Sequence, residues 1–175
     1  GTAGTGMRYQ DRDDLMLVEF DPGTVVAGVL TRSHTASAPV LWCRDNLGGG
    51  LARALIVNAG NANAFTGFIG SRDVRHICES VAERLGCPVE TVFVASTGVI
   101  GEHLPMERLL GGLPHAAANL DSSGWKRAAM AIMTTDTFAK AATREVQLGG
   151  TNVRISGFAK GSGMIEPDMA TMLAF

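Results

Sequence analysis

The feature that most constrains the fold is an amphipathic helix that lies between two short apolar runs. Apolar residues recur every three to four positions along "SRDVRHICESVAERLG", which predicts a helix with Ser71 as its N-cap and Gly86 as its C-terminal stop. The flanking apolar runs, residues 51–57 and 92–95, are typical of buried strands. Helix and strands are therefore expected to share one core.

Turn signals predict hairpins near both ends of the chain. Asp-Pro-Gly at residues 21–23 separates two runs rich in valine and leucine, and Gly149-Gly150 separates two alternating runs. Further helices are expected over "VLWCRDNL", over "DSSGWKRAAMAIMTTDT", and as two short pieces of "LPMERLLGGLPHAAANL" separated by glycines and Pro114. The order of elements predicts a single mixed α/β (α+β) domain over residues 1–175, with an at least partly antiparallel sheet.

Composition argues against several kinds of partner. The net charge of -2 comes without any cluster of Lys or Arg, which makes nucleic acid and membrane poor partners. Only 18% of residues are charged, against a usual share of about 25%, so we expect another chain to cover part of the surface. No apolar run approaches the roughly 20 residues that span a bilayer.

The cysteines and histidines predict neither a disulfide framework nor a metal site. The cysteines are odd in number and form no Cys-x-x-Cys pair, and the histidines lack the spacing of metal ligands. A reducing, cytoplasmic location is expected.

Three polar segments each allow a structural and a functional interpretation. "NAGNANAFTG" (residues 58–67) is either a structural loop or a polar site at the end of a strand. "ASTGVIG" (residues 95–101) is either a strand-exit turn or a source of donors for an oxyanion hole at Thr97-Gly98. "MTTDTF" (residues 133–138) carries more hydroxyl and carboxylate groups than a helix end requires.

The segment "FAKGSGMIEPDMATMLAF" (residues 158–175) contains a candidate nucleophile. A threonine with a free backbone amine can attack a carbonyl with that amine as its base. This requires that the bond between Ala170 and Thr171 be broken, through an N-to-O acyl shift and hydrolysis. From composition alone, a turn followed by a last strand is the favoured alternative.

Taken together and in this order, "NAGNANAFTG", "ASTGVIG", "MTTDT" and "KGSGMI.P.MATML" resemble the bacterial ornithine acetyltransferase (glutamate N-acetyltransferase) family of arginine biosynthesis. The resemblance implies a layered αββα-type sandwich of the DmpA and ornithine acetyltransferase kind, with this chain as its N-terminal part. It also implies a precursor that cuts itself between Ala170 and Thr171, so that a β chain begins at Thr171.

The resemblance further implies ping-pong acetyl transfer from N-acetylornithine to glutamate on the Thr171 hydroxyl. Thr97 and Gly98 match the oxyanion-stabilising pair, and Lys160 matches a substrate-binding lysine. The substrate-contacting threonine of "TTDT" falls best on Thr137, with Thr134 and Thr135 as alternatives, and the Asn loop is expected beside the pocket. No cofactor or metal is implied, although some members accept acetyl-CoA as donor.

The expected partner is the protein's own β chain, in an αβ heterodimer that assembles into a heterotetramer. Two departures from the family pattern qualify this. Glu166 and Asp168 add negative charge ahead of the cut, which would alter the cleavage rate. Residues 171–175 follow the expected cut, as in an unprocessed chain, a fragment, or two segments written as one.

Two alternatives remain open at this stage. A self-processing amidase or aminopeptidase of related fold would use water as the acyl acceptor. A non-catalytic ligand-binding domain would use the Lys-Gly-Ser-Gly segment only as a turn.

Overall fold

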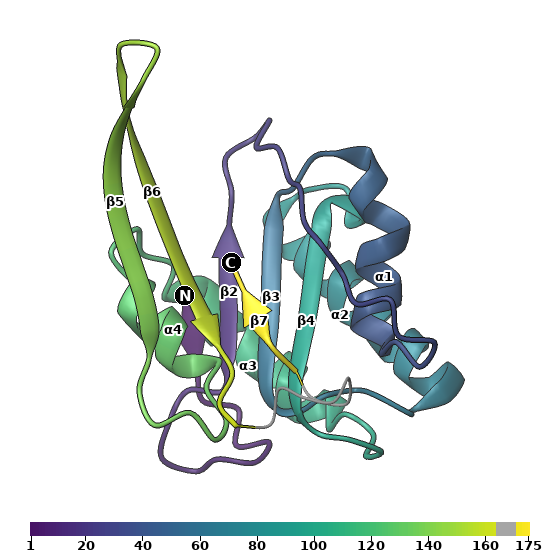
Figure 1. The fold of residues 1–175 in the computed structure, drawn as a ribbon. Helices are drawn as coiled ribbons and strands as arrows, with labels where there is room; N and C mark the ends of the chain where they lie inside the picture. Colours follow the sequence, from purple (N-terminus) through teal and green to yellow (C-terminus); the bar gives the residue numbers. More distant parts are fainter. Residues whose placement is uncertain (164–170) are drawn as a thin grey trace.

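The computed structural model describes residues 1–163 and 171–175, which form two packed sheets and a layer of helices (Figure 1). The first sheet has the order β1 (Thr2–Ala3), β2 (Leu15–Glu19), β3 (Ala54–Asn61), β4 (Val92–Val99). The second has the order β5 (Lys140–Leu148), β6 (Thr151–Lys160), β7 (Leu173–Ala174). The helices are α1 (Ala38–Asn46), α2 (Gly67–Leu85), α3 (Met106–Ala118) and α4 (Trp125–Ala131), with short 3-10 turns at Leu47–Gly49 and Val89–Thr91.

The first sheet is mixed. Strands β1, β2 and β3 are antiparallel neighbours, whereas β3 and β4 are parallel and are connected through α2. The carboxyl ends of β3 and β4 therefore lie at the same edge, the lower one in Figure 1. In sheets of this kind, that edge is where ligands usually bind.

Alternation along the strands divides the apolar residues between two cores, because successive side chains point to opposite faces of a sheet. On one face, Leu15, Leu17 and Ile56 pack against buried residues of α2 and α3, including Ile77 and Leu109. The apolar stripe that predicted the helix after residue 71 is thus the face that α2 buries. This part of the prediction is confirmed.

On the other face, Met16 and Val57 pack against Phe158 of β6, Leu173 of β7 and Ile132, which follows α4. The second sheet therefore covers the first, and in Figure 1 β7 crosses in front of β3. Helix α4 contacts β1, β2, β5 and β6, so it joins the two sheets along one side. The predicted mixed α/β class with layered packing is confirmed.

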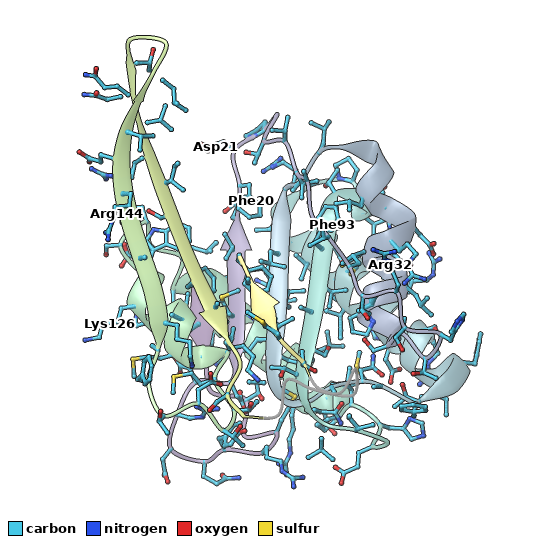
Figure 2. The ribbon with its side chains drawn as sticks, viewed as in Figure 1. Phe20, Asp21, Arg32, Phe93, Lys126 and Arg144 are labelled. Carbon is cyan, nitrogen blue, oxygen red and sulfur yellow. The ribbon has the colours of Figure 1, made fainter. Side chains whose placement is uncertain are left out.

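The outer face of the β5–β6 hairpin is exposed along most of its length. Its far end extends beyond the first sheet in Figure 1, and Arg144 on β5 lies on the outside of the molecule in Figure 2. Leu148 and Ile155 on this hairpin are 60% and 56% exposed. Among the described residues no helix covers this face, so the second helical layer of the αββα sandwich stays a prediction.

The predicted hairpin at Gly149-Gly150 is confirmed. Both glycines have positive φ, 55° and 83°, and the strands close directly across them with Leu148 opposite Thr151. A two-residue turn of this type requires left-handed backbone at both positions, which glycine adopts without steric cost.

The predicted hairpin at residues 21–23 is wrong. Strand β2 pairs with β1 and β3, and the residues after the turn form only an isolated bridge between Val25 and Leu51. Val25 and Val29 are 80% and 98% exposed. Valine-rich sequence favours a strand only where a sheet offers its side chains a surface to pack on, and the side chains of Val25 and Val29 lie exposed.

Helix boundaries also differ from the predictions. Residues 106–118 form one helix, α3, with Pro114 inside it rather than two short pieces. Leu109, Leu113 and Ala116 are buried on one face across the proline, so packing against the sheet outweighs the hydrogen bond that proline removes. Helix α2 begins at Gly67, with Thr66 rather than Ser71 at its N-cap.

Within the described residues, no helix has the length and apolarity needed to cross a membrane.

Replacement of Phe158 with alanine is expected to lower the free energy of unfolding by about 3–5 kcal/mol, measured by urea denaturation. Phe158 is 5% exposed and its ring lies 5.9 Å from that of Trp125 and 5.4 Å from that of Phe175. The matched control is Phe68→Ala, because Phe68 is 82% exposed. An equal loss in the two variants would contradict the assigned core.

Candidate active site

A buried lysine joins three segments that are distant in sequence. Lys160 ends β6 and is 5% exposed. Its Nζ donates to Thr97 Oγ1 in β4 at 3.1 Å and to Thr134 Oγ1, just after α4, at 2.7 Å. The ends of β4 and β6 thus meet at the edge of the sheet where β3 also ends.

Asp136 lies next to this cluster, and its side chain is 1% exposed. Its Oδ1 accepts hydrogen bonds from Lys140 Nζ at 2.7 Å and from the backbone N–H of Gly161 at 2.8 Å. Its Oδ2 accepts from the backbone N–H of Thr134 at 3.3 Å and lies 3.9 Å from Lys160 Nζ. One carboxylate therefore fixes the 133–136 turn to the ends of β5 and β6.

Burial and charge act on both ionisable groups of this cluster. Burial by itself raises the pKa of Asp136, but the hydrogen bonds from Lys140, Gly161 and Thr134 and the charge of Lys160 outweigh it and lower that pKa to about 2. Burial lowers the pKa of Lys160, Asp136 opposes that shift, and Lys140 adds to it. Asp136 is therefore ionised at neutral pH and is the group that favours the charged form of Lys160.

Thr97 and Gly98 lie inside β4, which continues to Val99, so the predicted turn after residue 95 is wrong. Gly98 has φ of 135° and lies opposite Gly60 of β3. A Cβ at position 98 would lie 2.3 Å from the carbonyl carbon of Gly60, so only glycine fits.

The Thr97 hydroxyl keeps a proton to donate. A hydroxyl has one donor and two acceptor positions, and that of Thr97 accepts from Lys160. Among the described residues no group accepts the Thr97 proton. A buried hydroxyl of this kind can stabilise negative charge that develops on a nearby carbonyl oxygen.

The loop predicted from residue 58 begins later, because Asn58 and Asn61 lie inside β3, and the asparagine side chains have a structural role. The Asn58 side chain donates to Asn61 O at 2.8 Å and accepts from Ser96 Oγ at 2.6 Å, next to Thr97. Asn63 donates to Gly70 O at 3.1 Å. These amides are buried and bonded within the protein, so they support the end of β4.

The threonines of the 133–138 segment differ in their contacts. Thr134 is the one that contacts Lys160, whereas Thr135 and Thr137 are exposed. The structure does not bring Thr137, the residue predicted from the resemblance, to Lys160. Sequence reasoning also missed Asp136 as a site residue, although the unusual density of polar groups in this segment was the available signal.

Thr171 is half-buried and lies two residues ahead of β7. Strand β7 pairs with β6 so that Leu173 lies opposite Lys160, and Phe175 and Phe158 exchange two backbone hydrogen bonds of 2.9 Å. The pairing therefore brings Thr171 to the end of β6 that carries Lys160. Ala170, Glu166 and Asp168 lie outside the described residues.

The cluster combines a buried ammonium, two hydroxyls bonded to it and a nearby threonine. Such a group suits the binding of a carboxylate and the polarisation of a carbonyl. Within residues 1–163 and 171–175, no three His, Cys, Asp or Glu side chains are placed to hold a metal ion.

Curated relatives share this sequence over nearly its whole length. The arginine biosynthesis bifunctional protein ArgJ of Gluconobacter oxydans is 59% identical over 170 residues, which is 97% of this chain and 40% of the relative. ArgJ of Rhizobium meliloti is 53% identical over 174 residues, which is 99% of this chain and 42% of the relative. The chain thus spans about two fifths of these relatives.

Solved structures share the fold. The ornithine acetyltransferase of Mycobacterium tuberculosis, solved in complex with ornithine, matches with a TM-score of 0.88 at 36% identity over 99% of this chain and 91% of that chain. ArgJ of Bacillus halodurans matches with a TM-score of 0.86 at 33% identity over 98% of this chain and 88% of that chain. The ArgJ family model matches residues 1–175. The chain belongs to the ArgJ family.

Proposed function

We propose that the protein transfers acetyl groups from N-acetylornithine to glutamate, with Thr171 as nucleophile after self-cleavage between Ala170 and Thr171. The observation that carries this proposal is the buried Lys160, bonded to Thr97 and Thr134 at the sheet edge where β7 approaches. The ornithine bound to the M. tuberculosis relative and the arginine biosynthesis named for the curated ones agree in substrate class.

The chemistry needs two half-reactions on one residue. In the first, the Thr171 hydroxyl attacks the acetyl carbonyl of N-acetylornithine, and its proton passes to the free Thr171 amine. The resulting oxyanion takes hydrogen bonds from the Thr97 hydroxyl and the Gly98 N–H. Collapse of this intermediate breaks the amide bond, and the departing ornithine amine takes the proton.

In the second half-reaction, the amine of glutamate attacks the acetyl ester of Thr171 at the same oxyanion position. The new amide bond forms as the ester bond breaks, and the proton lost by the glutamate amine returns to the Thr171 oxygen through the Thr171 amine. The products are N-acetylglutamate and free enzyme. Water in place of glutamate would make the protein an amidase.

Lys160 and Thr134 are suited to bind the α-carboxylate of the amino-acid substrates. Lys160 has three N–H donors and the two threonines use two of them, which leaves one for an α-carboxylate. Thr134 replaces Thr137 in this role, because its hydroxyl is the one at Lys160. Acetyl-CoA as an additional donor is part of the proposal, and no cofactor is required.

The lengths of the relatives support a divided chain. The segment spans 40–42% of the curated relatives but 88–91% of the solved chains that it matches. A polypeptide cut near the end of the matched segment accounts for both shares. The remaining β chain, in a heterodimer that assembles further, is our proposed cover for the exposed face of β5–β6.

The test supplies the full-length protein with N-acetylornithine, with and without glutamate. Ornithine release is expected to rise at least about tenfold with glutamate, with one N-acetylglutamate formed per ornithine and parallel double-reciprocal plots, as ping-pong kinetics require. Equal release of ornithine in both conditions would instead identify an amidase. No release in either would favour a binding domain.

A further inference from the structure

We propose that Asp136 is a positioning residue for acetyl transfer, which holds Lys160 charged so that the Thr97 hydroxyl points its proton at the reacting carbonyl. The inference rests on the proposed function. It extends that function to a carboxylate whose hydrogen bonds go to the protein itself, at Lys140, Gly161 and Thr134.

The distances separate a charge effect from a hydrogen-bond effect. Asp136 Oδ2 lies 3.9 Å from Lys160 Nζ, beyond hydrogen-bond range but close enough for strong Coulomb attraction between buried groups. The Lys160 hydrogen bonds go to the two threonines instead. Asp136 therefore favours the ammonium form without taking the N–H groups that hold Thr97 and Thr134.

The protonation state of Lys160 determines the direction of the Thr97 hydroxyl. An ammonium can only donate, so it occupies an acceptor position of Thr97 and leaves the hydroxyl proton for another acceptor. A neutral amine has a lone pair and can accept that proton. Loss of charge at Lys160 would thus turn the Thr97 proton away from the oxyanion position.

Two features of the surroundings lower the pKa of Lys160 and so make this control necessary. Lys160 is 5% exposed, and burial lowers its pKa. Lys140 of β5 is a second cation close by and lowers it further. Asp136 is the described group whose charge opposes both, and four contacts to its carboxylate keep it in place.

The test compares the pH dependence of kcat for acetyl transfer in the full-length, processed enzyme and its variants. In Asp136→Asn, the fall of kcat at alkaline pH is expected to begin about one pH unit lower than in wild type. At a fixed alkaline pH, kcat of the variant is then reduced about tenfold more than kcat of wild type. Asp136→Glu keeps the charge and is expected to keep the wild-type position of this fall, whatever its absolute rate. Lys140→Met is expected to move the fall to higher pH.

A second measurement does not depend on activity. The pKa of Lys160 Nζ, followed by NMR of isotopically labelled lysine side chains, is expected to decrease in Asp136→Asn and to increase in Lys140→Met. The opposite signs in the two variants cannot come from a general loss of folding. If Asp136→Asn does not fold, Lys140→Met and Asp136→Glu still test the charge effect.

Two results would overturn the inference. One is a kcat that falls equally at all pH values in Asp136→Asn, which is the result of a merely structural role. The other is a Lys160 pKa that is the same in all variants. Absence of acetyl transfer in the wild-type enzyme would count against the proposed function instead, because the Lys160 titration is measured without substrate.

Discussion

Replacement of Thr171 with alanine is expected to abolish both cleavage of the chain and acetyl transfer. Alanine has no hydroxyl to attack the preceding carbonyl or the acetyl group. The hydroxyls of Thr97 and Thr134 each accept a hydrogen bond from Lys160, and neither threonine gains a free backbone amine to act as its base. The measurements are intact mass, with no fragment that begins at residue 171, and a loss of kcat of at least about 10³-fold.

The controls separate this chemical effect from a structural one. Thr171→Ser keeps a hydroxyl and is expected to retain part of both reactions. Thr151→Ala removes an exposed threonine from the β5–β6 turn and is expected to leave both unchanged. Cleavage or acetyl transfer at the wild-type rate in Thr171→Ala would overturn the assignment of the nucleophile.

Replacement of Gly98 with alanine is expected to lower kcat/KM at least about 10²-fold, because the added methyl group displaces the proposed oxyanion donors, and loss of even one such donor costs that much. The new methyl group would lie 2.3 Å from the Gly60 carbonyl carbon and 2.5 Å from Asn61 N. The ends of β3 and β4 must then separate, which moves Thr97 from Lys160. A loss of about 2–4 kcal/mol in the free energy of unfolding is expected as well.

Gly48→Ala is the matched control for this variant. Gly48 has no atom within 4 Å of an added Cβ, and its substitution is expected to change the free energy of unfolding by less than about 0.5 kcal/mol. Steady-state kinetics and urea denaturation measure both effects. Wild-type activity in Gly98→Ala would show that the close approach of β3 and β4 does not define the site.

Local sequence predicted the elements whose determinants are local. The apolar period of α2 and the glycine pair between β5 and β6 each contain the information that fixes their structure. The strand expected after residue 23 failed because a strand needs a neighbour, and the sequence does not reveal that β1 takes that place beside β2. The prediction of two helices separated near Pro114 failed for the same reason, because packing of α3 on the sheet keeps the helix continuous.

The residues of the candidate site were likewise predictable only in part. Resemblance led to Lys160, Thr97 and Gly98, which the structure places at one sheet edge. It did not separate Thr134 from Thr137, because the turn after α4 decides which hydroxyl faces β6. The role of Asp136 depends on contacts with the ends of two strands, and no local pattern encodes these.

The pairing of β7 with β6 has a consequence for the two products of the proposed self-cleavage. The backbone bonds between Phe158 and Phe175, and the packing of Leu173 in the second core, involve residues on the far side of the proposed cut. A cut ahead of Thr171 would therefore create a free amine two residues ahead of a strand that stays anchored. The enzyme would gain a reactive terminus without releasing a subunit.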